Sequence, residues 1–157
     1  MRRSTRSAHP TIWKAVYLLK RILADRPTAS ALHSEKYNYN RDAGPPANAA
    51  QGFHSHLRYI DAPWGSGYLV LTQHSQDNGS RINNDELFYL FQGITKDNKL
   101  LLSGSFSVTH RTLPDKFDAA PSGTLEEDVK RLDRLDDDSF SPSLKDLQKM
   151  VSLIQIK

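Results

Sequence analysis

The sequence predicts an α+β domain in which an antiparallel β-sheet of about four to five strands carries packed helices. Apolar residues recur at helical spacing in residues 11–25. The period changes to two within residues 53–109, which is typical of half-buried strands, and the composition favours helices again after Pro114. At 157 residues the chain is long enough for one domain. We divide it into a flexible basic leader, 1–10, and a single α+β domain, 11–157.

Composition and charge exclude several classes of protein. The chain has no cysteine, which excludes disulfide scaffolds, thiol catalysis and cysteine-ligated metal centres. The net charge is +3, but residues 1–24 carry six basic side chains and no acidic one, so the rest of the chain is net acidic. A nucleic-acid module normally carries its basic surface on the folded domain, and we therefore predict no nucleic-acid partner.

The first predicted element is an amphipathic helix over residues 11–25, bounded by Pro10 and Pro27. The same stretch is basic and free of acid, so a targeting or membrane-surface role remains open beside the structural one. Its expected inner face consists of Ile12, Ala15, Val16, Leu19, Ile22 and Leu23.

The middle of the chain predicts a sheet. Glycine and asparagine predict tight turns at 63–67, at Asp77–Ser80 and at Asp97-Asn98. In the last strand apolar and small polar residues alternate, which favours a sheet covered on one side. The expected strands are 53–59, 68–72, 87–94 and 100–109.

The last third predicts two helices. Thr124 and Glu127 have capping-box spacing. A second helix is expected over 143–152, with Ser141 as its cap and Pro142 in its first turn. Residues 136–138 are three aspartates that predict a solvated helix end, because a calcium loop would need alternating oxygen ligands and a central glycine. Leu153–Ile156 is expected to form a short final strand.

A distinctive block lies in the predicted sheet. It comprises Tyr68-Leu-Val-Leu-Thr-Gln-His74, Ile82-Asn-Asn-Asp-Glu-Leu-Phe-Tyr89, Phe91-Gln-Gly-Ile-Thr-Lys-Asp97 and Ser105-Phe-Ser-Val-Thr-His-Arg-Thr-Leu-Pro114. It resembles the block "fLTQy…INNxELfYtFQGLTxDGkYyvs…PvtHpxLP" of a family of bacterial envelope proteins and lipoproteins with no established activity. The similarity extends over about residues 12–157. It implies that the protein is located in the cell envelope, outside the cytoplasm, and it implies no particular reaction.

Two departures from that family bear on the expectations. Family members have strands and an export signal ahead of the first helix, and this chain shows no signal peptide or lipobox cysteine. Two alternatives are therefore open: a gene product truncated at its N-terminus, or a homologue whose start has drifted. The family's Asp-Gly turn is Asp97-Asn98 here, and asparagine tolerates the left-handed conformation that such a turn needs. The architecture would resemble the α/β/α sandwich of PsbP-like proteins.

One pair of histidines is a candidate metal site. In a regular strand the side chains of His54 and His56 point to the same face and could share one ion. A third ligand would have to come from His74 or Asp61. The alternative is that both are ordinary histidines on the solvated face of an edge strand. We therefore predict no cofactor.

A second candidate site consists of amides and aromatic side chains around the sheet. The amides could bind a ligand, or they could satisfy backbone groups at strand ends. Trp64 and Tyr68 could form an exposed binding cluster at a hairpin tip, or Trp64 could pack onto the sheet. The candidate ligand-binding residues are Trp64, Tyr68, Gln73, Asn83, Asn84 and Gln92.

No motif for nucleophilic or nucleotide chemistry occurs in the chain. We therefore predict a non-enzymatic accessory domain of the bacterial cell envelope that binds an unidentified protein or small molecule. Two alternatives are a metal-dependent enzyme that uses His54 and His56, and a membrane-surface protein that uses the basic helix 11–25. An open sheet edge would pair with another chain, so both a monomer and an edge-strand dimer are compatible with the sequence.

Overall fold

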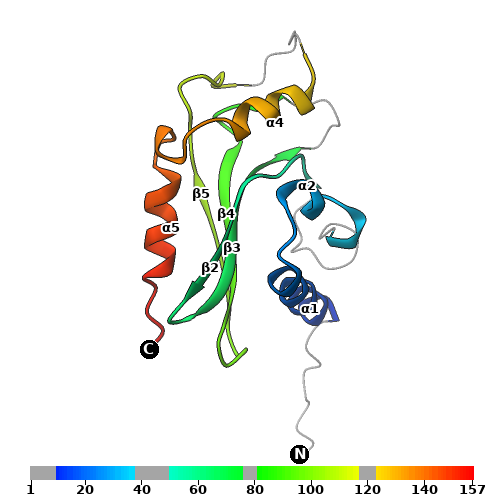
Figure 1. Cartoon of the computed structure of the whole chain (residues 1–157), viewed down its shortest axis with the longest axis vertical. Coiled ribbons are helices and arrows are strands. Elements are labelled where there is room, and N and C mark those ends of the chain that lie inside the picture. The colour runs from blue at the N-terminus through cyan, green and yellow to red at the C-terminus, as the bar shows by residue number, and fades with distance from the viewer. Residues whose placement is uncertain (1–9, 38–49, 76–80, 117–122) are drawn as a thin grey trace, which may run out of the picture.

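A computed structural model describes residues 10–37, 50–75, 81–116 and 123–157. In these residues an antiparallel sheet lies between two layers of helices (Figure 1). The predicted α+β class and antiparallel sheet are confirmed. The helices are α1 (Pro10–Asp25), α2 (Ala29–Leu32), α4 (Leu125–Asp133) and α5 (Leu144–Ser152), with short 3-10 helices η1 (Glu35–Tyr37) and η2 (Asp137–Ser139). The strands are β1 (Ala50–Gln51), β2 (Ser55–Ala62), β3 (Gly65–Ser75), β4 (Leu87–Thr95) and β5 (Leu101–Ser107).

The four longer strands form an antiparallel meander in the order β2-β3-β4-β5. The two-residue β1 pairs with the far end of β3, on the same side as β2. The register places Tyr59 opposite Tyr68, and Leu69 opposite Phe91. In the described part of the chain, β2 and β5 are therefore the long edge strands.

Each face of the sheet has its own core, because successive side chains of a strand point to opposite faces. Leu69 and Leu71 of β3 belong to the core beneath α4 and α5. Tyr68 and Val70 belong to the core beneath α1 and α2. Burial on both sides explains why β3 is an almost continuous apolar run. The predicted one-sided cover holds for β5, where exposed and half-buried residues alternate.

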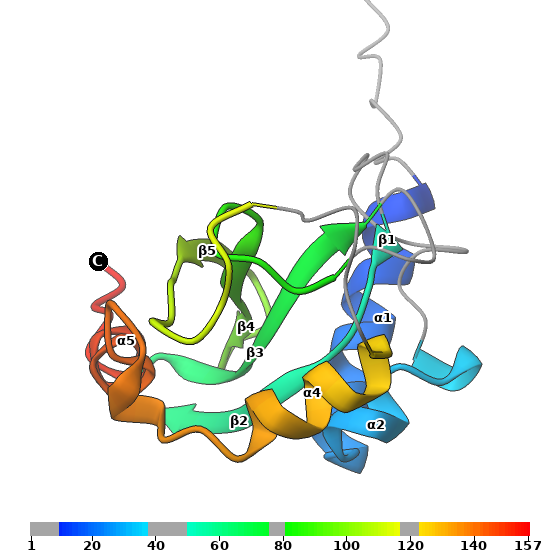
Figure 2. The ribbon, with the colours of Figure 1, turned by 90° about the horizontal axis from the view of Figure 1, so that it is seen from above.

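In the view from above, the first helical layer is blue and the second is orange to red, so the two layers come from opposite ends of the chain (Figure 2). The layer of α1 and α2 precedes the sheet, and the layer of α4 and α5 follows it. The two layers stand on opposite faces and both reach the β2 edge, since α2, α4 and α5 all contact β2.

Several local predictions can be compared with the structure. The capping box of Thr124 and Glu127 is present, and Asn98 adopts the expected left-handed conformation with φ of 59°. Ser141 is not the cap of α5: its backbone pairs with Thr109, and Ser143 caps the helix instead. The turn expected at Asp77–Ser80 lies outside the described residues.

The expected final strand is also wrong. Residues 154–157 have no regular structure, and Leu153 is the cap of α5. Leu153 and Ile156 are exposed, at 66% and 43%. A strand needs a sheet edge to pair with, and this segment follows a helix that packs on the face of the sheet.

Candidate functional site

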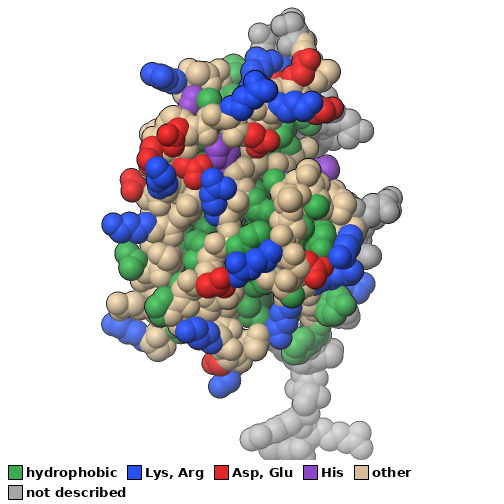
Figure 3. All heavy atoms as spheres, in the orientation of Figure 1, with side chains coloured by type: hydrophobic (Ala, Val, Ile, Leu, Met, Phe, Trp, Pro, Cys, Tyr) green, Lys and Arg blue, Asp and Glu red, His purple; other side chains and the backbone are tan. Residues whose placement is uncertain are grey.

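A hollow of about 640 Å³ lies at the open edge of β2, between the two helical layers. The first layer contributes the segment after α1, and the second contributes the segment after α4. Acidic and basic side chains are spread over the face of the molecule that Figure 3 shows. The lining residues are Arg26, Pro27, Thr28, Ala29, His56, Leu57, Arg58, Tyr59, Asp133, Leu135, Asp136, Asp137 and Lys145.

A bulge in β2 determines which side chains reach this hollow. The register with β3 shifts between Ser55 and Arg58, and His56 has a φ of 47°. A bulge places an extra residue on one strand, so two successive side chains point the same way. Both Ser55 and His56 turn toward the second layer: Ser55 Oγ donates to Asp133, and the His56 ring reaches the carbonyl of Leu132.

The same bulge separates the two candidate metal ligands. His54 contacts the first layer, where its ring lies 5.3 Å from that of His33. Its Nε2 donates to Gln51 Oε1 at 2.5 Å. The expectation that His54 and His56 share one face is therefore wrong, because the extra residue inverts the alternation between them. Within the described residues, no three metal-ligating side chains gather at one point.

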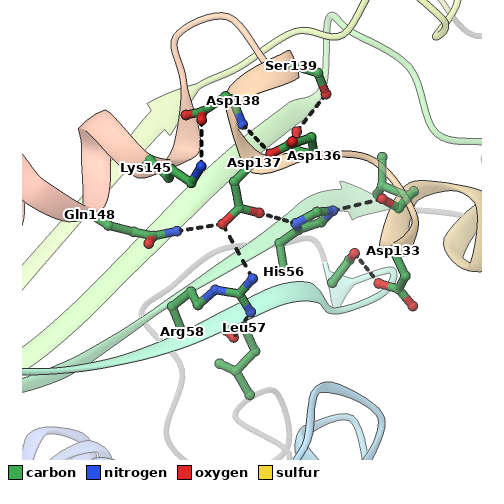
Figure 4. A network of polar contacts seen from close by, with 12 residues as sticks. His56, Leu57, Arg58, Asp133, Asp136, Asp137, Asp138, Ser139, Lys145 and Gln148 are labelled. Atoms are coloured by element: carbon green, nitrogen blue, oxygen red, sulfur yellow. Dashed lines mark hydrogen bonds and ion pairs between the residues drawn. The ribbon is translucent and has the colours of Figure 1, made fainter.

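His56 is the centre of a buried polar network (Figure 4). Its Nδ1 lies 2.6 Å from Asp137 Oδ1, and its Nε2 lies 2.7 Å from the carbonyl oxygen of Leu132. A carbonyl oxygen can only accept, so the ring nitrogen that faces Leu132 donates, and the other ring nitrogen shares a hydrogen bond with the carboxyl group of Asp137. The prediction of a solvated aspartate run is wrong for Asp137, which is only 8% exposed.

The network extends from β2 to β4 and α5. Asp137 Oδ2 accepts from Gln148 Nε2 at 3.2 Å and from Arg58 at 3.4 Å. Gln148 also donates to the hydroxyl of Tyr89 at 3.0 Å, and that hydroxyl donates to the carbonyl of His56 at 3.2 Å. These bonds fix the wall of the hollow that the second layer provides.

The other wall is tied to β2 by Arg26 and Tyr59. The Arg26 guanidinium donates to Asp61, which together with a hydrogen bond from Ser66 lowers the pKa of the Asp61 carboxyl. The guanidinium also lies 5.5 Å from the centre of the Tyr59 ring. Tyr59 donates its hydroxyl to the carbonyl of Pro27 at 2.7 Å, and burial raises its pKa to about 12.

The structure places the predicted aromatic residues in the cores rather than at a binding surface. Trp64 is 6% exposed, and its Nε1 donates to the carbonyl of Val151 at 2.9 Å. Its ring stands edge-on to Phe91, with 5.7 Å between the ring centres. Tyr68 is 4% exposed within the first-layer core. The expectation of an exposed aromatic cluster is therefore wrong, and the packing alternative is confirmed.

Two of the four predicted amides satisfy backbone groups in the segments before β4 and after β5. Gln73 donates to the carbonyl of Arg81 and accepts from the backbone N–H of Asn83. Asn84 donates to the carbonyls of His110 and Leu113 and accepts from the N–H of His110. These bonds support the structural alternative.

The two remaining amides differ in burial. Asn83 is 1% exposed; its Nδ2 donates to the carboxylate of Glu86, and its Oδ1 accepts from the backbone N–H of Glu86. Gln92 is half-buried in β4, opposite Ser103. None of the six predicted ligand-binding residues lines the hollow at β2.

Sequence reasoning found His56 but missed the residues around it. Arg58, Asp137 and Lys145 lie far apart in the chain and come together through packing of α5 against β2. The available signal was the charged Arg58 inside the β2 pattern, since charged side chains are common on edge strands.

Comparison with known proteins gives no relative. No family model matches the chain, and neither the curated proteins nor the solved structures contain a significant match. The similarities to the envelope family and to PsbP-like proteins therefore stay predictions. No helix in the described residues combines the length and the hydrophobicity needed to cross a bilayer.

Proposed function

We propose that the protein is a non-enzymatic partner-binding domain of the bacterial cell envelope, which holds an extended segment of another polypeptide along β2. The observation that carries this proposal is the hollow at the outer edge of β2, walled by both helical layers. The place in the envelope comes from the sequence resemblance alone. The binding mode comes from the site.

The edge of β2 offers backbone hydrogen bonds to such a segment. Among the described strands β2 pairs only with β3, so its other edge has no strand beside it. An unpaired edge is a template for another strand, and added strands derive affinity from main-chain bonds. Side chains of the bound segment would point alternately to the two walls, which gives the site its selectivity.

The two walls favour a peptide over a small ion. One wall presents Pro27, Ala29 and Leu57, and the other presents Leu135 beside three aspartates. Cations also line the hollow, at Arg58 and Lys145 among others. A mixture of apolar surface and charges of both signs fits a polypeptide with varied side chains better than a ligand of one charge.

The state of His56 supports binding rather than catalysis. A general base needs a free lone pair within reach of substrate. Both ring nitrogens of His56 are engaged within the protein, and Lys145 donates to Asp138 at 2.6 Å. The metal-enzyme alternative gains no support, because His54 and His56 contact different layers.

The proposal can be tested with a phage-displayed library of random peptides selected against the immobilised protein. We expect enriched peptides that bind one to one by titration calorimetry and that perturb the amide NMR signals of residues 57–61. Leu57→Glu and Arg58→Glu should each weaken binding about tenfold or more, since a central contact is lost or reversed in charge.

The matched control is Lys130→Glu, a charge reversal at an exposed position of α4 outside the hollow. It should leave peptide affinity unchanged. The proposal would be contradicted if the selection enriched no peptide. It would also be contradicted if the enriched peptides bound both β2 variants as tightly as they bind the parent protein. Light scattering that shows a dimer broken by Arg58→Glu would also contradict it, by assigning the edge to a second copy of the chain.

A further inference from the structure

The outward face of α1 carries two large aromatic side chains that the fold does not bury. Trp13 is 64% exposed and Tyr17 is 68% exposed. They lie one helical turn apart, on the side of α1 opposite the residues that pack on the sheet, such as Ile22. Exposed aromatic residues next to each other mark an interaction surface more often than isolated ones do.

Basic side chains flank this aromatic pair. Lys14 and Lys20 are exposed, and within the described residues neither has an ion-pair partner. Arg21 lies beside them and is 3.9 Å from Asp25, the only acidic residue of the helix. The nine residues that precede α1 in the sequence add three arginines and no acid.

We propose that this outward face of α1, made of Trp13, Lys14, Tyr17, Lys20 and Arg21, binds the surface of a membrane that contains anionic phospholipids. Trp and Tyr combine an apolar ring with a polar tip and settle at the level of the lipid headgroups. Lysine and arginine stems lie along apolar surface while their charged ends reach the phosphates.

The shape of the surface favours a membrane over a protein or nucleic-acid groove. The face is the outer side of a single helix that covers the sheet on the side away from α4 and α5 (Figure 1). A convex ridge of this kind inserts side chains into a soft interface without a matching cavity in the partner. The inference does not rest on the proposed function, because the hollow at β2 is lined by none of these five residues.

The test is co-sedimentation of the full chain with vesicles of phosphatidylcholine, alone or mixed with phosphatidylglycerol. We expect binding to the mixed vesicles only, and release at high salt because the screening length falls from about 10 Å at 0.1 M to about 3 Å at 1 M. Brominated lipid should quench the fluorescence of Trp13, whereas the buried Trp64 stays bright. Replacing both Trp13 and Tyr17 with alanine should reduce partitioning at least about tenfold, because two rings are withdrawn from the interface.

Matched controls come from the opposite layer. The double reversal Lys14→Glu with Lys20→Glu should weaken binding to the mixed vesicles, and its control is Lys149→Glu with Lys157→Glu. The control for the aromatic pair is Leu153→Ala, which removes an apolar side chain that is 66% exposed. The controls should bind vesicles as the parent does. Protein that stays in solution with both vesicle types, or binding that the α1 variants and the controls weaken equally, would overturn the inference. Circular dichroism would confirm that each variant is folded.

Discussion

Replacing Asp137 with alanine removes the carboxyl group that forms a hydrogen bond with the buried ring of His56. Asp137 is 8% exposed and links β2, through His56, to Gln148 of α5. Without it, one ring nitrogen of His56 loses its hydrogen-bond partner, and Gln148 loses one acceptor. The physical consequence is the desolvation cost of buried polar groups left unsatisfied rather than the loss of a surface contact.

The magnitude follows from that burial. Leaving a buried hydrogen-bonding group unsatisfied costs about 1–3 kcal/mol, compared with about 0–1 kcal/mol for an exposed ion pair. For a domain of this size, each kcal/mol lowers the melting temperature by about 2–4 °C. We therefore expect Asp137→Ala to lower the melting temperature by about 2–12 °C.

The assay is thermal and urea unfolding of Asp137→Ala beside Asp138→Ala. The neighbouring aspartate is exposed and pairs with Lys145 at the surface, so its loss should cost less than about 1 kcal/mol. A cycle with His56→Leu should show coupling between the two positions of about 0.5–3 kcal/mol.

Equal melting temperatures for the Asp137 and Asp138 variants would refute this reasoning, as would independent effects of the Asp137 and His56 substitutions. Either outcome would mean that the network does not hold β2 to the second layer. The wall of the hollow would then need another explanation.

Three further changes test the packing and the titration of the fold. Gly93→Ala would place a methyl group 2.7 Å from the Trp64 ring and should cost about 1–3 kcal/mol in urea unfolding, whereas Gly104→Ala meets its nearest atom at 3.7 Å and should be tolerated. Thr124→Ala removes the capping box of α4 and should cost about 1 kcal/mol, which a shift of the urea midpoint would reveal. Burial, with a smaller contribution from neighbouring His33, lowers the pKa of His54 to about 4 from an unfolded value near 6.5. The unfolded chain therefore takes up the proton at a higher pH than the folded chain does, and His54 should lower the stability by up to about 3 kcal/mol as the pH decreases from about 6.5 to about 4. Burial also lowers the pKa of His110, so His54→Gln should reduce this pH dependence without removing it.

Much of the architecture was predictable from short-range patterns. The spacing of Leu19 and Ile22 predicts the buried face of α1, and the threonine–glutamate pair at 124 and 127 predicts the start of α4. These features depend on neighbours within one turn, so the local sequence contains the whole signal.

The candidate site was predicted only in part. His56 was singled out, but with the wrong neighbour, because the bulge at Ser55 and His56 breaks the period of two on which the prediction relied. The sequence left open whether Trp64 is exposed or packed on the sheet. The structure shows it packed, with a hydrogen bond to Val151, which lies 87 residues away in the chain.

The sequence alone therefore determined the class of fold, most of its helices and strands, and the basic character of α1, since each of these depends on residues close together in the chain. Only the tertiary structure decided that Asp137 is buried against His56, and that Trp13 and Tyr17 are left exposed. The hollow at β2 joins residues from positions 26 to 145, and long-range packing rather than local pattern brings them together.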